Sequence, residues 1–116
     1  MSKLISRSAL YWAFWICALA VLVLSLMPPG APMPTTGWDK SNHLLGFGVL
    51  ALLGHWAYPG RTAIVLAGLL AYGGLIEVLQ SFTPDRFAEF DDLIADGLGL
   101  ALGEAVARLV GRLRLR

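Results

Sequence analysis

The sequence ALYWAFWICALAVLVLSLM, residues 9–27, contains no charged side chain and is about as long as a helix that crosses the hydrocarbon core of a bilayer. It lies within residues 8–38, which are also free of Asp, Glu, Lys and Arg. The chain has 116 residues, of which 57% are hydrophobic and 15% are charged. Soluble domains average about 25% charged residues, and small domains bury the lowest fraction of their surface. Lipid is therefore the expected surrounding of this chain.

Three further apolar runs follow along the sequence. Residues 41–60 contain no Asp, Glu, Lys or Arg, residues 62–84 contain only Glu77, and residues 97–107 contain only Glu104. Because an unsatisfied backbone group in hydrocarbon costs several kcal/mol, each run should be helical. We predict an all-α fold in a single domain, residues 1–116. It is a polytopic membrane bundle of four transmembrane helices, over residues 9–27, 41–58, 63–82 and 92–110.

The basic residues predict the orientation of this bundle. Cytoplasmic loops carry the excess of Lys and Arg, and here most of these residues fall on one side: Lys3, Arg7, Arg61, Arg108, Arg112, Arg114 and Arg116. Lys40 and Arg86 fall on the other side. Both termini should therefore be cytoplasmic, in a bacterial inner membrane. Lys3 and Arg7 before an apolar run also resemble a signal peptide, but the run is longer than such peptides use.

Polar residues gather at the opposite, outer end of the predicted bundle. Within each helix they recur every three or four residues, so they share a face. An ionisable residue inside a membrane is by default a functional candidate with a partner. We therefore predict an outward-facing polar pocket whose candidate ligand-binding residues are Asp39, Lys40, His43, Glu77, Gln80, Arg86, Asp92 and Asp96.

Several of these residues also have simpler interpretations. Asp39 directly precedes a predicted helix, where Asp is a preferred N-cap. Arg86 could pair with Glu77 or Asp92, and Lys40 could pair with Asp96. His55 reads as an interfacial residue without a role, and Glu104 reads as isolated. On the inward face of the last helix, Gly99-x-x-x-Gly103 is the small-residue spacing that lets helix backbones approach closely.

The order of these residues forms a pattern: Asp39-Lys40-x-x-His43-x-x-x-Phe47, Glu77-x-x-Gln80, Arg86 six residues before Asp92, and Ala95-Asp96-x-x-Gly99-x-x-x-Gly103. From residue 39 to residue 103 this pattern resembles the VanZ-like family. That family consists of small integral membrane proteins named for a member linked to resistance to the glycopeptide antibiotic teicoplanin. The resemblance implies a family more firmly than a reaction. Where the family usually has Asn, this chain has Asp96, which makes the site more acidic unless Asp96 is protonated.

Three classes of function remain open. The first is a module that binds the headgroup of a lipid-linked cell-wall precursor or a glycopeptide antibiotic. The second is an intramembrane enzyme, with His43 and Glu77 as base and acid and a divalent cation on Asp92, Asp96 and His43. The third is a scaffold whose polar residues only fix helix packing.

Enzymatic activity is the least favoured of these three classes of function, since the chain has no HExxH, no G-x-S-x-G and no nucleophile beside a base. No catalytic residue, metal ligand or cofactor is assigned. The expected partners are membrane lipids and the amphiphiles named above, with no nucleic acid. A homodimer through Glu104 or the glycine-rich faces stays open.

Overall fold

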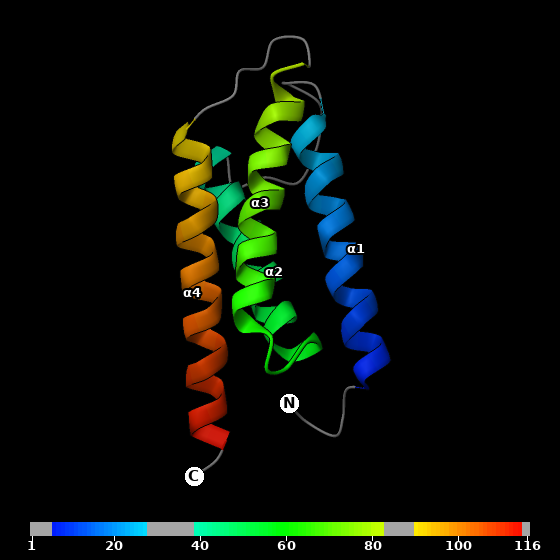
Figure 1. The fold of residues 1–116 in the computed structure, drawn as a ribbon, viewed down its shortest axis with the longest axis vertical. Helices are drawn as coiled ribbons and strands as arrows, with labels where there is room; N and C mark the ends of the chain where they lie inside the picture. The colour runs from blue at the N-terminus through cyan, green and yellow to red at the C-terminus, as the bar shows by residue number, and fades with distance from the viewer. Residues whose placement is uncertain (1–5, 28–38, 83–89, 115–116) are drawn as a thin grey trace.

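The computed structural model describes residues 6–27, 39–82 and 90–114, without the side chains of residues 39–41, 90 and 114. These residues form the helices α1 (Arg7–Leu26), α2 (Asp39–Ala57), α3 (Thr62–Gln80) and α4 (Phe90–Arg114). Within these ranges there is no strand, so the predicted all-α class is confirmed. The helices alternate in direction and form an elongated bundle (Figure 1).

The predicted helix boundaries differ from the observed ones by a few residues. The beginning of α2 at Asp39 places this residue inside the first turn, whereas the sequence suggested a cap ahead of the helix. At its other end, α4 continues four residues beyond the predicted residue 110. Leu and Arg are good helix formers, and no proline follows, so the helix extends past the apolar run that predicted it.

One end of the bundle collects cationic residues. The α2–α3 turn contains Gly60, whose φ of 81° suits glycine, and Arg61 N–H donates to the Tyr58 carbonyl across the turn. This turn lies at the same end as the beginning of α1 and the end of α4 (Figure 1). Arg7, Arg61 and Arg112 therefore share that end, as the sequence predicted, and α2 and α4 run parallel to each other.

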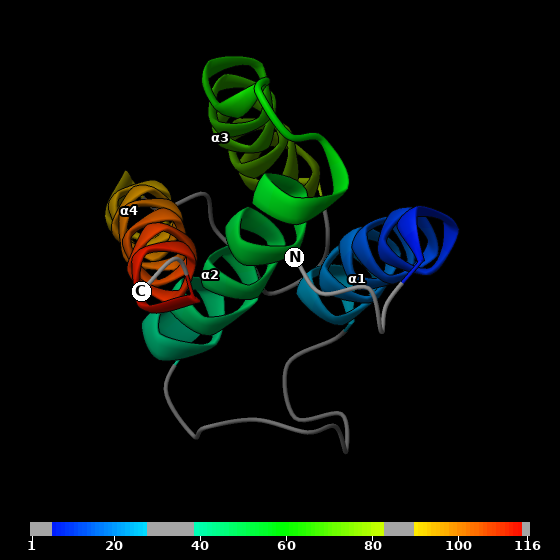
Figure 2. The same cartoon turned by 90° about the horizontal axis from the view of Figure 1, so that it is seen from below.

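The closest helix contact is between α2 and α4, with α2 at the centre of the bundle (Figure 2). A Cβ added to Gly99 would overlap the Leu44 carbonyl oxygen, and one added to Gly103 would overlap the Gly48 carbonyl oxygen. Since backbone atoms cannot move aside as a side-chain tip can, only glycine fits at these two positions. The predicted close approach at Gly99 and Gly103 is confirmed, and α2 of the same chain occupies this glycine face.

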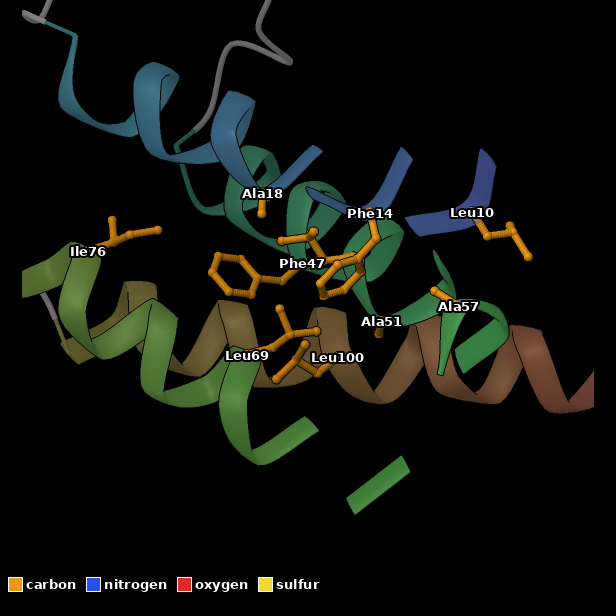
Figure 3. Close-up of a cluster of buried hydrophobic side chains, with 10 residues drawn as sticks. Leu10, Phe14, Ala18, Phe47, Ala51, Ala57, Leu69, Ile76 and Leu100 are labelled. Atoms are coloured by element: carbon orange, nitrogen blue, oxygen red, sulfur yellow. The ribbon is translucent and has the colours of Figure 1, made fainter. Parts of the chain in front are cut away.

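Large apolar side chains fill the centre of the bundle. Phe14, Phe47, Leu69 and Leu100 come from the different helices and meet in one cluster (Figure 3). Phe47 is completely buried and packs against the ring of Tyr72, with 6.2 Å between ring centroids. This core holds the inner faces of the helices together and leaves their outer faces uncovered.

Only α1 and α3, among the described helices, are long and apolar enough to span a membrane by composition. Their most apolar segments have mean hydropathies of 2.2 and 2.0. The polar residues of α2 and α4 lower the average of those two helices. The prediction of four spanning helices is therefore supported by composition for two of them.

Side-chain burial gives α4 an inverted pattern. Three of its four acidic residues, Asp92, Asp96 and Glu104, are buried against the bundle, and Asp91 in the first turn is exposed. Its outward face exposes a row of large apolar residues at steps of four: Ile94, Leu98, Leu102 and Val106. A helix of a soluble protein has the opposite arrangement, with its apolar stripe on the core.

Candidate functional site

The side chain of His43 in α2 lies between two carboxylates of α4. Its Nδ1 is 2.8 Å from Oδ1 of Asp96, which is a hydrogen-bond distance. Its Nε2 is 3.9 Å from Oδ2 of Asp92. Asp92 and Asp96 are one helical turn apart on α4, so both carboxylates project from the same face. Two neighbouring carboxylates and one imidazole thus meet at the α2–α4 interface.

The third helix adds Glu77 to this group. One ligand-type atom from each of His43, Glu77 and Asp96 lies within 4.8 Å of the other two. Gly73, one turn before Glu77, allows α3 to come this close. A Cβ at Gly73 would lie 2.5 Å from Oδ2 of Asp96. We call His43, Glu77, Asp92 and Asp96 the His43 cluster.

The three carboxylates of the His43 cluster are buried. Asp96 is completely buried, and Glu77 and Asp92 are each 7% exposed. Among the described residues, Oδ2 of Asp96 has no hydrogen-bond partner. A buried charge is costly unless it is paired, hydrogen-bonded or bound to a metal. The cluster is therefore suited to hold a proton or a cation.

Other predicted site residues lie elsewhere or outside the described part. Gln80 is buried, and its amide nitrogen donates to the Ser25 carbonyl of α1 at 2.8 Å. Asp39 and Lys40 lie in the first turn of α2, but their side chains are outside the described residues, as is the whole of Arg86. The suggested pairs of Arg86 and Lys40 therefore stay predictions.

The sequence assigned no metal ligand but named Asp92, Asp96 and His43 as the residues that would hold a divalent cation if one is bound. The structure brings a partly different group closest together. Glu77, rather than Asp92, joins His43 and Asp96 within 4.8 Å. Asp92 instead faces the second ring nitrogen of His43. The sequence spacing missed this because the position of Glu77 relative to α4 depends on how α3 packs.

A second His–carboxylate group lies toward the other end of the bundle. Nδ1 of His55 is 3.0 Å from Oε2 of Glu104, and Nε of Arg108 donates to the same oxygen at 2.6 Å. The interpretation of Glu104 as isolated was wrong, and His55, to which the sequence assigned no role, is one of its partners. Glu104 is 8% exposed, and its contacts with His55 and Arg108 lie within its own chain.

The position of this second group follows from the register of α2 relative to α4. Parallel helices rise by the same 1.5 Å per residue. If His43 is level with Asp96, then His55, twelve residues later, is level with Arg108. Glu104 precedes Arg108 by one turn. The observed contact of His43 with Asp96 therefore brings His55 close to Glu104 and Arg108.

An apolar groove of about 640 Å³ lies between α1 and α3. Trp15, Leu22, Leu69 and Tyr72 are among its lining residues, and Arg61 lies at one end. Tyr72 O–H donates to the Ala18 carbonyl at 2.5 Å, and Trp15 N–H donates to the Tyr58 hydroxyl at 2.9 Å. No member of the His43 cluster lines the groove, so the two features are separate.

Comparison with known proteins gives one match. The family described as VanZ/LLP1 matches residues 5–111, which include every described residue of the His43 cluster. No curated protein and no solved structure matches the chain.

Proposed function

The chain belongs to the VanZ/LLP1 family, and from that premise we propose that it is a multi-pass membrane protein that binds the polar headgroup of an amphiphile. The observation that carries this proposal is the convergence of buried polar side chains from three helices at one end of the bundle. His43, Asp96 and Glu77 lie within 4.8 Å there. An intramembrane cluster of ionisable groups is a functional site by default.

All four helices cross the membrane in this proposal. α1 and α3 have the length and hydropathy for it. The inverted pattern of α4 supports its insertion, because Leu98 and Leu102 face outward while Asp96 is buried. The average hydropathy of such a helix underestimates its tendency to insert into a membrane, because its buried polar residues do not contact lipid. α2 is central (Figure 2), and its His43 side chain is only 9% exposed.

The bundle is oriented with both termini in the cytoplasm of a bacterium. Arg7, Arg61 and Arg112 lie at one end, as Figure 1 shows for the corresponding parts of the chain. Cytoplasmic segments carry the excess of such residues. The His43 cluster, at the other end, then faces outward from the inner membrane.

The proposed ligand is a lipid-linked cell-envelope precursor or a glycopeptide of the teicoplanin type. Lys40 and Arg86, which the sequence assigns to the outer end, would bind phosphate or carboxylate. The carboxylates of the His43 cluster would accept hydrogen bonds from amines or hydroxyls. Binding of either amphiphile at this surface would contribute to antibiotic resistance.

A second candidate is an intramembrane enzyme that acts on the same class of lipid-linked substrate. The approach of His43 to Glu77 and Asp96 favours it, since an imidazole beside carboxylates can transfer protons. The alternative without a ligand is a scaffold, in which the His43–Asp96 hydrogen bond only fixes how α2 packs on α4.

Native mass spectrometry separates these possibilities. The protein is extracted gently from its own membrane, and the wild type is compared with Glu77→Gln and with Glu104→Gln, a buried carboxylate of the second group. We expect a lipid-linked sugar to copurify with the wild type and with Glu104→Gln but not with Glu77→Gln. If the wild type carries no such ligand and Glu77→Gln mainly lowers stability, the scaffold is correct.

A further inference from the structure

We infer that His43, Glu77 and Asp96 form a binding site for a late first-row divalent cation, with Zn²⁺ as its representative. This inference rests on the proposed function, because it concerns the same end of the bundle. An ion at the centre of three atoms separated by 4.8 Å would lie roughly 2.8 Å from each. Ligand distances for zinc are about 2.0–2.2 Å, so each atom would have to move inward by less than about 1 Å. Side-chain rotation covers such a distance.

Asp96 supplies an independent indication of a missing ligand. This residue is completely buried, and among the described residues its Oδ2 accepts no hydrogen bond. The same oxygen is directed at Gly73 of α3, one turn from Glu77, where a side chain of any size would displace it. A buried polar atom without a partner needs a physical reason. A cation between α3 and α4 would be that reason.

The donor set selects the kind of ion. Two carboxylates neutralise a divalent charge, and a neutral imidazole adds a nitrogen donor. Calcium and magnesium prefer oxygen ligands, with coordination numbers of six or more, whereas imidazole suits Zn, Cu, Fe and Ni. His43, Glu77 and Asp96 together therefore fit a transition metal such as zinc better than they fit magnesium.

The remaining contacts of His43 indicate which of its ring nitrogens would bind the cation. The ion would bind Nδ1 of His43 and Oδ2 of Asp96, and it would replace the hydrogen bond that now joins Nδ1 to Oδ1 of Asp96. Nε2 would then carry the ring hydrogen and face Oδ2 of Asp92, 3.9 Å away. Metal-bound histidines commonly donate their other N–H to a carboxylate in this way. Asp92 is accordingly a positioning residue and not a ligand.

Three protein ligands leave a coordination position open. Zinc sites with three protein ligands hold water or an exogenous group in the fourth position. At the outer end of the bundle, that position would take an anionic oxygen of the headgroup, a phosphate or a carboxylate. The inferred ion would therefore recognise the proposed amphiphile by binding an anionic oxygen of its headgroup.

The second His–carboxylate group is a natural control. In that group the guanidinium of Arg108 already bonds to Oε2 of Glu104 at 2.6 Å. A divalent cation there would meet a fixed positive charge. Glu104→Gln therefore alters a buried carboxylate paired with a histidine without touching the inferred site.

The test uses the full chain in lipid nanodiscs, stripped with a chelator and titrated with ZnCl₂ by calorimetry. We expect one Zn²⁺ per chain in the wild type and in Glu104→Gln. Asp96→Asn and Glu77→Gln should weaken binding by at least about tenfold, and Asp92→Asn by roughly tenfold to a hundredfold through the orientation of His43. X-ray absorption at the zinc edge should show one imidazole nitrogen and two carboxylate oxygens.

Three results would overturn the inference: no Zn²⁺ uptake by folded wild type, equal affinity in wild type and Asp96→Asn, or equal losses in Asp96→Asn and Glu104→Gln. Circular dichroism and monodispersity establish that each variant is folded. If Asp96→Asn does not fold, Glu77→Gln and the wild-type absorption spectrum decide.

A parallel titration with a polyprenyl diphosphate and with teicoplanin, with and without the chelator, keeps the two proposals apart. Zn²⁺ binding without binding of either amphiphile supports the cation site and contradicts the proposed function. Binding of an amphiphile that the chelator does not change, without Zn²⁺ uptake, overturns the cation site and supports the proposed function.

Discussion

Nδ1 of His43 in α2 and Oδ1 of Asp96 in α4 lie 2.8 Å apart, although 53 residues separate them in the chain. Their contact depends on a backbone approach nearby. Gly99 follows Asp96 by three residues, and its α-carbon faces the Leu44 carbonyl, next to His43. The apolar packing of α2 on α4 and the polar contact are therefore parts of one interface, and a change in either should affect the other.

Gly103→Ala should destabilise the protein. The added Cβ would overlap the Gly48 carbonyl oxygen and lie 2.9 Å from the Ala51 Cβ, and overpacking of this kind costs typically 1–3 kcal/mol. Gly97→Ala on the same helix is the matched control, because among the described residues no atom lies within 4 Å of its added Cβ. Thermal unfolding in nanodiscs compares them. Equal stability of the two variants would contradict the predicted contact.

The His55–Glu104 pair should contribute a measurable coupling to stability. Each side chain is at least half buried, and the two are 3.0 Å apart. A double-mutant cycle with His55→Gln and Glu104→Gln should give an interaction energy of about 0.5–3 kcal/mol, the range for residues in contact. Chemical unfolding of the four proteins supplies the values. Additive effects would mean that the pair is only a consequence of packing.

Arg108 should matter less than His55 for the stability of this second group. Its side chain is 64% exposed, so solvent screens its charge more than it screens the half-buried imidazole of His55. Arg108→Gln should therefore lower the free energy of unfolding by less than His55→Gln, in the same unfolding experiment. A larger effect of Arg108→Gln would show that the guanidinium, and not the imidazole, holds Glu104.

A spin label at Leu102 should collide with oxygen more often than with a polar nickel chelate. The residue is 54% exposed on the outward face of α4, which the proposed topology places in hydrocarbon. A label at Gly60 in the α2–α3 turn, exposed at the end of the bundle, should show the opposite preference. Electron paramagnetic resonance in liposomes measures both. Preference for the nickel chelate at Leu102 would place α4 in water.

Cysteine labelling from outside the cell tests the orientation. In a Cys17→Ala background, an impermeant maleimide should label Thr36→Cys and Glu89→Cys but not Gly60→Cys. The reason is that Arg61 and its neighbours should stay on the cytoplasmic side. Permeabilised cells provide the control for Gly60→Cys. Labelling of Gly60→Cys in intact cells would place the His43 cluster on the cytoplasmic side and contradict an outward-facing site.

The sequence by itself determined the elements of this protein. Runs without charge predicted the helices, because the backbone in an apolar environment must satisfy its own hydrogen bonds. The spacing of Gly99 and Gly103 predicted a close helix contact, because helical periodicity is a local property that the chain carries in its order. Alternation of helix direction then assigned His43, Glu77 and Asp96 to one end of the bundle.

Only the tertiary structure decided which of these residues touch. It joined Asp96 to His43, brought Glu77 within 4.8 Å of both, and paired Glu104 with His55. Such pairings depend on the rotation and axial offset of each helix relative to its neighbours. Those quantities are set by glycine contacts and by the fit of side chains such as Phe47 in the core. Each of these contacts involves several helices, so no single stretch of sequence determines it.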